Sequence, residues 1–380
     1  MISRAPAARL LASEPDQYGR TNEKRGKSVN GDGRNDHGWR AYIGSTAGGA
    51  GVVTAETDPE SGALKEAHRT DAVAHPSYLA VSGDRRLLYA VSETPDGAAA
   101  AFSLAGERPV LLAPPAPVHG SAPTHLTPHA GHLLTANYRS GSVSALPLRA
   151  DGAPTEPRAG GVLQHHGSGP HPERQTGPHA HAVVADPSGR WVLSVDLGTD
   201  SVRVCDIDPG SGELVMRREV AMRAGTGPRH LRFHPDGRLA YVINELEPTV
   251  TTCRWDAVRG LLTPVGETPA LPEGGATPTL PSEFVVSADG RFGWAANRGD
   301  DSIAVLELAD GGLAPRLVTT VPCGGNWPRD LALHPDGRHL YAANERSGDV
   351  TWFTVDPATG IPERGGSLPV PSASCVVFAR

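Results

Sequence analysis

The stretch HHGSGPHPERQTGPHAH, residues 165–181, holds five histidines: His165, His166, His171, His179 and His181. Imidazoles at this density suit three interpretations: metal ligands, a general base, or a polar loop without chemistry. A metal site needs convergent ligands, yet the cysteines lie elsewhere and no carboxylate stands at a diagnostic spacing. We therefore expect no metal and no other cofactor. The choice between the other two interpretations depends on where the fold places each histidine.

Three charged residues further along the chain stand in distinctive motifs. They are Arg229 in GPRH, Glu245 in INE and Arg298 in NRG. Arginine binds phosphate or carboxylate through paired hydrogen bonds, and beside a carbonyl it stabilises the oxyanion of a tetrahedral intermediate. Histidine or glutamate accepts a proton from water or from a carbon acid. Together with a histidine, this set suits hydrolysis of an anionic lactone, and equally lactone formation from a carboxylate and an alkene.

The elements that must position these residues repeat along the chain. Each repeat has a proline, an alternating strand, a polar turn such as PDGR and a second strand that ends in a polar pair. The repeats begin at Pro76, Pro123, Pro178, Pro228, Pro281 and Pro328. Their starts lie 47, 55, 50, 53 and 47 residues apart, and third strands such as DDSIAVLEL follow. This period predicts one four-stranded antiparallel sheet per repeat, as in the blades of a propeller.

A seventh repeat is split between the two ends of the chain. PSASCVVFAR opens the pattern from Pro371 and stops after one strand, and AYIGSTAGGAGVVTAETDPESGAL supplies the strands that should follow. Pairing of the two ends closes the ring and removes exposed sheet edges. We therefore predict an all-β, seven-bladed β-propeller with four-stranded antiparallel blades over residues 40–380. Residues 1–39 are polar and rich in Gly and Asn, and we predict a disordered extension there.

The hairpin that opens each repeat predicts which residues meet at the mouth of the central channel. In the GPRH repeat the turn centres on Gly237, with Arg229 eight residues before it and Glu245 eight after, so these two should be neighbours. The same folding brings Glu283 toward Arg298 in the next repeat.

In the PHAH repeat the hairpin brings His179 and His181 toward Asp196. Side chains two residues apart share a strand face, so both histidines point the same way, and we expect His181 to face the channel. The other three histidines of the stretch lie in the preceding loop, where we expect them to be structural or to cover the channel mouth.

The composition narrows the class of protein. A mildly acidic formal charge of −7 gives no electrostatic case for nucleic acid, and no apolar run approaches membrane-spanning length. The four cysteines are far apart and are expected to be reduced, half-buried strand residues: Cys205, Cys253, Cys323 and Cys375. We therefore expect a cytoplasmic protein without nucleic-acid or membrane partners, as a monomer or weak homo-oligomer.

Five segments together resemble the lactonase family of seven-bladed propellers. They are LLTANYRSGSVSALPL, GPHAHAVVADPSGR, GPRHLRFHPDGRLAYVINE, ANRGDDSIAV and PRDLALHPDGRHLYAANE. The family groups bacterial 6-phosphogluconolactonases with fungal carboxymuconate-lactonizing enzymes. The resemblance covers residues 41–380, and its motifs occur together and in order, which is more specific than a generic propeller repeat.

The resemblance implies roles for individual residues. In the lactonizing members, the proposed catalytic set corresponds to His181, Arg229, Glu245 and Arg298. We add four substrate-binding candidates: His179, His230, Glu283 and Asp196. The chain departs from the family pattern at YIGSTA, which is usually YIGTYT-like, and at Trp294, where a tyrosine is more usual. Neither departure involves the catalytic set.

The leading hypothesis is hydrolysis of a small anionic lactone, 6-phosphoglucono-δ-lactone, to 6-phosphogluconate in the pentose phosphate pathway. Arg229 and Arg298 would hold the anionic group or the developing oxyanion, while His181 or Glu245 would activate water. Three alternatives stay open: a carboxymuconate-type lactonizing lyase, a calcium-dependent sugar lactonase, and a non-catalytic binding scaffold. The GH…WD signature of WD40 scaffolds is absent from the sequence.

Overall fold

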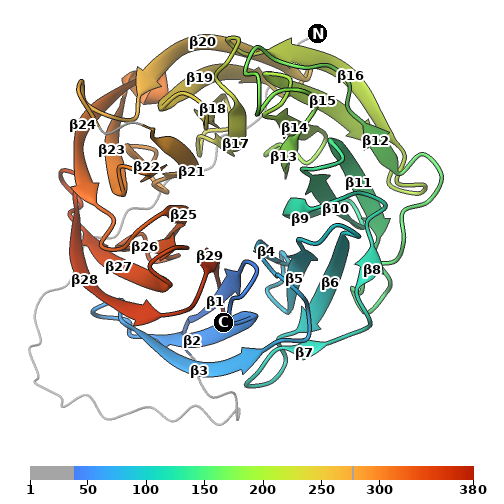
Figure 1. Ribbon diagram of the computed structural model, residues 1–380, viewed down its shortest axis with the longest axis horizontal. Coiled ribbons are helices and arrows are strands. Elements are labelled where there is room, and N and C mark those ends of the chain that lie inside the picture. The colour runs from blue at the N-terminus through green and yellow to red at the C-terminus, as the bar shows by residue number, and fades with distance from the viewer. Residues whose placement is uncertain (1–37, 276–277) are drawn as a thin grey trace, which may run out of the picture. The chain divides into compact units, whose positions relative to one another are not determined.

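Seven β-sheets surround a central axis in the computed structural model, which describes residues 38–275 and 278–380 (Figure 1). Six sheets have four strands, and in the remaining one the outer position is divided between two short strands that both pair with the third. One short 3-10 helix, η1 (Asp310–Gly312), completes the elements of the described residues. The predicted seven-bladed propeller is confirmed. The predicted disordered extension falls almost wholly on residues 1–37, which lie outside the described residues.

Each blade has the same strand order from the axis outward. The inner strands are β4 (Leu79–Val81), β9 (Pro123–His129), β13 (Ala180–Ala185), β17 (Pro228–Phe233), β21 (Leu280–Val286), β25 (Pro328–Leu333) and β29 (Ala373–Ala379). The second strands are β1 (Arg40–Ser45), β5 (Leu87–Ser92), β10 (His132–Asn137), β14 (Val192–Asp196), β18 (Leu239–Asn244), β22 (Phe292–Arg298) and β26 (His339–Asn344).

The outer half of each blade completes the sheet. The third strands are β2 (Val52–Thr57), β6 (Ala98–Ser103), β11 (Ser142–Pro147), β15 (Ser201–Ile207), β19 (Thr249–Asp256), β23 (Ser302–Ala309) and β27 (Asp349–Val355). The outer strands are β3 (Leu64–Thr70), β7 (Val110–Leu111) with β8 (Ala116–Pro117), β12 (Val162–Gln164), β16 (Leu214–Ala221), β20 (Leu261–Pro269), β24 (Ala314–Pro322) and β28 (Pro362–Pro369).

The ring closes where the C-terminal strand pairs with the first described strand. β29 is the inner strand of a blade whose other strands are β1, β2 and β3, and its ladder with β1 runs from Arg40 opposite Ala379 to Ser45 opposite Ala373. Both ends of the propeller unit therefore contribute to one sheet, as the split repeat predicts. This pairing closes the ring, because every inner strand then has the inner strand of another blade on each side (Figure 1).

The polar turns between first and second strands have the backbone conformation that their glycines allow. The turn glycines of four repeats have φ of 71° to 72°: Gly189, Gly237, Gly290 and Gly337. A side chain is strained in this region, whereas glycine enters it freely. In the PDGR turn at Gly237, its amide donates to the His234 carbonyl at 2.9 Å, which reverses the chain and sets the register of β17 against β18.

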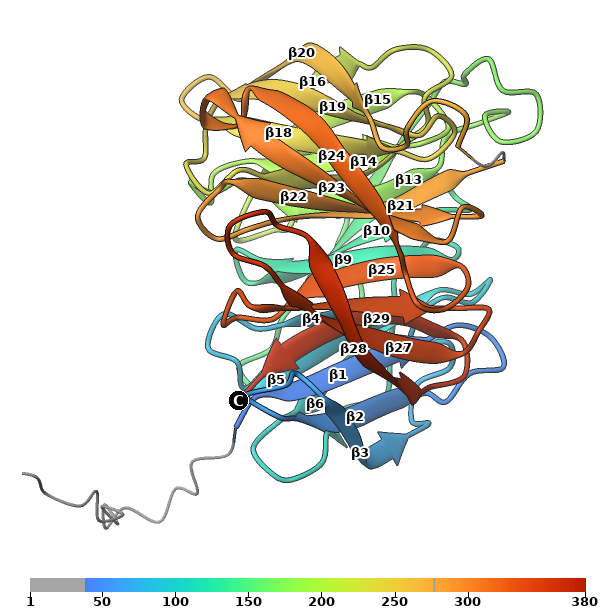
Figure 2. The ribbon, with the colours of Figure 1, turned by 90° about the vertical axis from the view of Figure 1, so that its left-hand side faces the viewer.

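The hydrophobic core consists of seven clusters, each shared by two neighbouring blades. Tyr241 of β18, for example, packs against Phe284 of β21, with ring centroids 5.4 Å apart. Figure 2 shows the sheets stacked face to face around the ring, which is the arrangement that creates these interfaces. The apolar faces of each sheet are thus covered by the next blade, and the polar side chains are left for the axis and the outer surface.

The four cysteines are free and fully buried, so the prediction that they are half-buried was wrong. Cys323 also lies just beyond β24 and not within a strand. The reason is that these positions fall in the interfaces between blades, where a sheet is covered on both faces. Within residues 38–275 and 278–380, the structure contains no helix with the length and apolar character of a membrane span.

Candidate active site

In six of the seven blades, a β-bulge near the start of the inner strand turns a side chain toward the axis. In β17, Pro228 pairs with Asn244 and His230 pairs with Ile243, so Arg229 is an extra residue without a partner. Equivalent register shifts in other blades leave Thr124, His181, Ser282, Arg329 and Ser374 at the corresponding place. Bulges re-aim side chains in this way beside functional sites. The repeated bulge therefore builds a ring of axis-facing residues, which we call the bulge ring.

Side chains of the bulge ring hold neighbouring inner strands together. The Ser282 hydroxyl donates to the Pro328 carbonyl at 2.6 Å, and the Ser374 hydroxyl donates to the Ser77 carbonyl at 2.8 Å. Arg229 donates from one terminal nitrogen to the Ser282 carbonyl. These bonds satisfy buried polar groups and fix the position of each bulge relative to the next blade.

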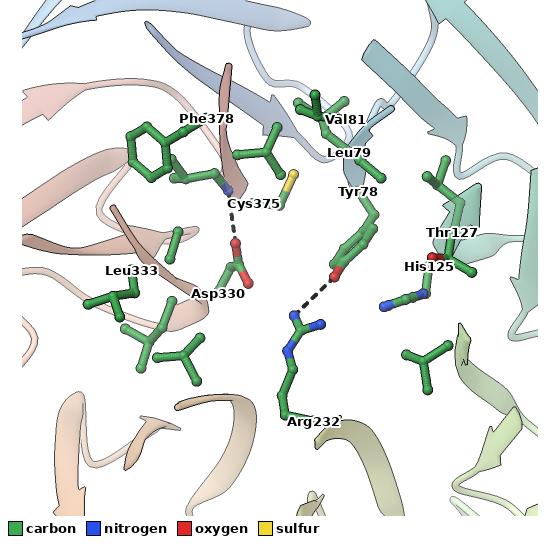
Figure 3. A pocket seen from close by; sticks show the side chains of 18 of the residues that line it. Tyr78, Leu79, Val81, His125, Thr127, Arg232, Asp330, Leu333, Cys375 and Phe378 are labelled. Atoms are coloured by element: carbon green, nitrogen blue, oxygen red, sulfur yellow. Dashed lines mark hydrogen bonds between the residues drawn. The ribbon is translucent and has the colours of Figure 1, made fainter. Parts of the chain in front are cut away.

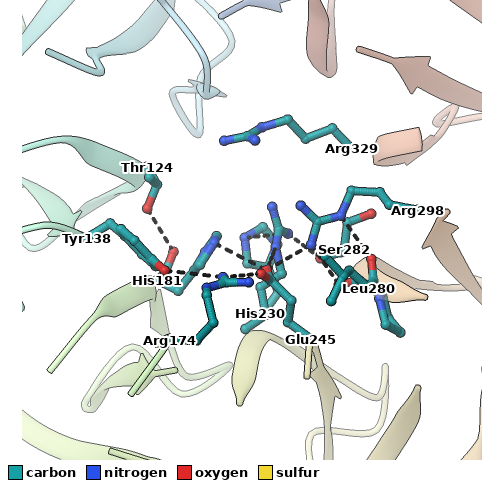
Figure 4. A network of polar contacts seen from close by, with 12 residues as sticks. Thr124, Tyr138, Arg174, His181, His230, Glu245, Leu280, Ser282, Arg298 and Arg329 are labelled. Carbon is teal, nitrogen blue, oxygen red and sulfur yellow. Dashed lines mark hydrogen bonds and ion pairs between the residues drawn. The ribbon is translucent and has the colours of Figure 1, made fainter. Parts of the chain in front are cut away.

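A second set of side chains joins the bulge ring from the ends of the second strands. Glu245 directly follows β18, and Arg298 is the last residue of β22. Tyr138 and Glu345 occupy the equivalent places after β10 and β26. Each hairpin places its bulge residue beside the end of its own second strand, so the two sets meet at one end of the axis (Figure 4).

Glu245 is the centre of this site (Figure 4). Its Oε2 accepts hydrogen bonds from Arg229 Nε at 3.0 Å and pairs with Arg298 Nη2 at 2.8 Å. Its Oε1 pairs with Nη2 of Arg174, and His181 Nε2 lies 3.9 Å from Oε2. The structure therefore brings together all four residues of the predicted catalytic set. Three guanidiniums on one carboxylate leave a surplus of positive charge.

Burial and the neighbouring charges control ionisation in the site. Burial raises the pKa of Glu245, but the charges of Arg298 and Arg229 outweigh it and hold the pKa well below its usual range. Burial, aided by the charge of Arg298, lowers the pKa of Arg229 to about 10, so Arg229 stays charged at neutral pH. The carboxylate is anionic and already fully engaged, which makes it a weak proton acceptor.

His181 is neutral at physiological pH. Burial, and then the charge of Arg229, lower its pKa well below the ordinary value. Its Nδ1 is buried and has no hydrogen-bond partner among the described residues. Tyr138 contacts the ring edge-on with centroids 5.4 Å apart, and it stacks on His179 at 4.5 Å. Because an unsatisfied buried nitrogen is costly, His181 Nδ1 is a position where a bound water molecule would complete the hydrogen bonding.

The prediction that Glu283 lies against Arg298 was wrong. Glu283 instead accepts a hydrogen bond from His230 Nδ1 at 2.8 Å and pairs with Arg232 at 3.0 Å. Arg298 bonds to Glu245 and to the carbonyls of β21. The bulge in β21 spans two residues, Ser282 and Glu283, so Glu283 lies outside the regular register that counting along the hairpin assumes. Nε2 of His230 accepts a hydrogen bond from Arg229 Nη1 at 3.2 Å, which helps to hold the Arg229 guanidinium in place.

Asp196 does not join the site, contrary to its prediction as a substrate-binding residue. It is fully buried and binds His165 Nδ1 at 2.7 Å and Arg203 at 3.2 Å. It also accepts from the backbone amides of His179, Gly198 and Thr199. The reason is that Asp196 is the last residue of β14, and its carboxylate caps the turn that follows. His165 is thus structural and does not cover the mouth.

The remaining histidines of the opening stretch lie at the edge of the site. His179 donates a hydrogen bond from Nδ1 to the Tyr138 carbonyl, 2.9 Å away, and orients that tyrosine beside His181. His166 is exposed, and His171 lines a cavity of about 570 Å³. Arg174 and Leu280 also line this cavity, and the Leu280 carbonyl accepts from Arg298 Nε at 2.9 Å. The cavity therefore adjoins the network around Glu245.

Two arginines of the site escaped the sequence analysis. Arg329 points toward Glu245 from the β25 blade, two blades further round the ring (Figure 4), and lies 3.5 Å from both Glu93 and Glu345. Its signal was available, because PRD in its repeat matches PRH at Arg229. Arg174 comes from the histidine-rich loop, where no periodic pattern marks a residue that reaches Glu245. These two are also the more solvent-exposed arginines of the site, at 19% and 32% of the side chain.

Comparisons with known proteins agree with this architecture. The family model "Lactonase, 7-bladed beta-propeller" matches residues 40–378. A 6-phosphogluconolactonase of Bacillus subtilis is 33% identical over 348 residues, covering 89% of this chain and 97% of that protein. A 6-phosphogluconolactonase of Pectobacterium carotovorum is 29% identical, with 74% and 81% covered. The structure of a periplasmic gluconolactonase from Pseudomonas aeruginosa superposes with a TM-score of 0.82 at 28% identity, covering 90% of this chain and 99% of that one. The chain belongs to the lactonase family of seven-bladed β-propellers.

Proposed function

We propose that this protein hydrolyses a sugar lactone, with 6-phosphoglucono-δ-lactone as substrate and 6-phosphogluconate as product. The observation that supports this is the set of guanidiniums around Glu245, since three contact it and Arg329 faces it. This surplus of positive charge suits a substrate with a phosphate group, and also an oxyanion that develops during the reaction. The names of the relatives from B. subtilis and P. carotovorum agree with this substrate.

In the proposed mechanism His181 is the general base. It removes a proton from a water molecule, the water oxygen bonds to the lactone carbonyl carbon, and a tetrahedral intermediate forms. The bond from that carbon to the ring oxygen then breaks, and the ring oxygen takes the proton from His181 to become a hydroxyl. Glu245 stabilises the transient imidazolium from 3.9 Å. We prefer His181 over Glu245 as base because the carboxylate of Glu245 already binds three guanidiniums.

The arginines divide into two groups by exposure. Arg229 and Arg298 are nearly buried, and their hydrogen bonds to backbone carbonyls hold them in place, which suits preorganised stabilisation of an oxyanion. Arg174 and Arg329 are more exposed, so we assign them to the phosphate of the substrate. This division predicts that the inner pair governs kcat and the outer pair governs KM for phosphorylated substrate.

An assay of lactone opening tests the proposal. 6-Phosphogluconolactone is generated in situ, and its hydrolysis is measured with the wild type and with His181→Asn. The rate of spontaneous hydrolysis is subtracted from each. We expect enzyme-dependent hydrolysis that His181→Asn reduces about 100-fold or more. Glucono-δ-lactone, which lacks the phosphate, and a carboxymuconate substrate are run in parallel. Activity on carboxymuconate alone would favour a lactonizing lyase, and activity on none of the three would favour a binding scaffold.

We also propose a cytoplasmic location and a role in the pentose phosphate pathway. Four buried cysteines without disulfides are the state expected of a reducing compartment. Fractionation of cells with an antibody to this chain would locate the protein. Recovery with the periplasmic or secreted fraction would contradict the proposal.

A further inference from the structure

A second cavity lies on the axis at the end opposite to Glu245. It has a volume of about 500 Å³ and is lined by residues from all seven inner strands, mostly toward their C-terminal ends. Its wall is mostly apolar and includes Val81, Val184, Val286, Leu333 and Phe378, together with Thr127. Buried His230 separates the two ends, because its ring centroid lies 5.2 Å from His181 on one side and 5.2 Å from His125 on the other. A volume of this size fits a small organic molecule.

Polar side chains converge at the floor of this cavity (Figure 3). They are Tyr78, His125, Arg232 and Asp330, and each comes from a different blade. Arg232 donates through Nη2 to Glu283 at 3.0 Å and to the Tyr78 hydroxyl at 3.4 Å. Among the described residues, no group accepts a hydrogen bond from its Nε or Nη1. One third of the Arg232 side chain is exposed to solvent. The cavity therefore contains a fixed cation with unused donors.

Burial favours the neutral form of two other ionisable groups at the floor, Asp330 and His125. Asp330 accepts from the Val376 amide at 2.8 Å, and burial together with the charge of Glu283 raises its pKa well above the usual range. Burial and the charge of His230 lower the pKa of His125, which keeps that imidazole neutral. Nε2 of neutral His125 and the hydroxyl of Tyr78 lie around the guanidinium of Arg232 and offer further donors to one acceptor group.

We propose that this cavity is a second binding site, for a small carboxylate with an apolar body. The carboxylate accepts hydrogen bonds from the unused donors of Arg232, and the apolar body packs on the ring of aliphatic and aromatic wall residues. Charge-assisted hydrogen bonds of this kind are among the strongest in proteins, and a mostly apolar wall with a few convergent polar groups is the usual form of a ligand site. This site does not depend on the proposed lactone hydrolysis, since none of its lining residues contacts Glu245.

Calorimetric titration of the full chain with benzoate tests the proposal, with benzyl alcohol as the uncharged analogue of the same shape. We expect benzoate to bind and benzyl alcohol to bind at least about tenfold more weakly. Arg232→Gln should weaken benzoate by at least about tenfold, and Thr127→Phe, which fills the cavity and leaves its floor intact, should abolish binding. Thermal unfolding shows whether each variant is folded. If Arg232→Gln does not fold, Thr127→Phe alone tests the site.

The arginines of the opposite end provide the control, because benzoate is also an anion. Arg298→Gln should leave the affinity at the second cavity unchanged. Three results would overturn the proposal: no binding of benzoate to wild type, binding that Arg298→Gln removes and Arg232→Gln retains, or binding that neither Arg232→Gln nor Thr127→Phe changes.

Discussion

Replacement of Glu245 by glutamine tests the electrostatic basis of the proposed mechanism. In the transition state, the imidazolium of His181 lies 3.9 Å from Glu245 Oε2. Two unit charges at this distance attract by about 4 kcal/mol at an effective dielectric constant of about 20. Glutamine keeps the shape of the side chain and removes the charge, so kcat should fall about 1,000-fold. KM should fall or stay level, because three guanidiniums lose a competing anion.

The assay follows the hydrolysis of 6-phosphogluconolactone and subtracts the spontaneous rate. It is run at about pH 7.5, where His181 is unprotonated. Glu345→Gln is the matched control, since Glu345 occupies the equivalent place in another blade but lies 3.5 Å from Arg329 and is partly exposed. Its kcat should stay within about threefold of wild type. Removal of Glu245 leaves buried guanidiniums without their partner and destabilises the fold, so kcat is measured well below the unfolding temperature of each variant.

A folded Glu245→Gln protein with kcat within about tenfold of wild type would refute this reasoning. It would mean that no positive charge develops on His181, or that the developing charge is stabilised elsewhere. A large loss in both Glu245→Gln and Glu345→Gln would point to a general loss of structure at the channel mouth and would also contradict the specific role given to Glu245.

Three further predictions follow from the same contacts. Arg229→Gln should shift the acid limb of kcat/KM to higher pH, because the Arg229 charge lowers the pKa of His181 and kcat/KM rises as this base loses its proton; an unchanged pH profile would contradict the assignment. Arg329→Gln should raise KM for 6-phosphogluconolactone at least about tenfold and leave KM for glucono-δ-lactone within about twofold, as measured by initial rates. Asp196→Ala should lower the free energy of unfolding in urea by about 3 kcal/mol or more, because buried His165 and three backbone amides lose their acceptor, and kcat of the folded fraction should not change.

The fold was predictable because its signals are local and repeated. Proline, alternating strand, PDGR-type turn and second strand recur along the chain, and turn glycines with φ near 71° fix four of the hairpins. Pairing of Arg229 with Glu245 followed from counting residues on either side of Gly237, and the structure places these two side chains 3.0 Å apart. The contact that links Arg174 to Glu245 was not predictable, because it depends on the path of a loop that has no repeat partner.

The error at Glu283 has a physical cause that also shows how the site is encoded. Counting along a hairpin assumes regular pairing, but each bulge adds a residue and changes which side chain faces the axis. The bulge position of the repeats holds Thr124, His181, Arg229, Ser282, Arg329 and Ser374. The ionisable members of this ring all lie between β13 and β28, on one side of the axis, where Glu245 and Arg298 also lie. Thr124 and Ser374 belong to the other side and are uncharged. A lactone held by these arginines would therefore bind off the axis, against the blades of β13 to β28, and the arginines would reach it from one side only.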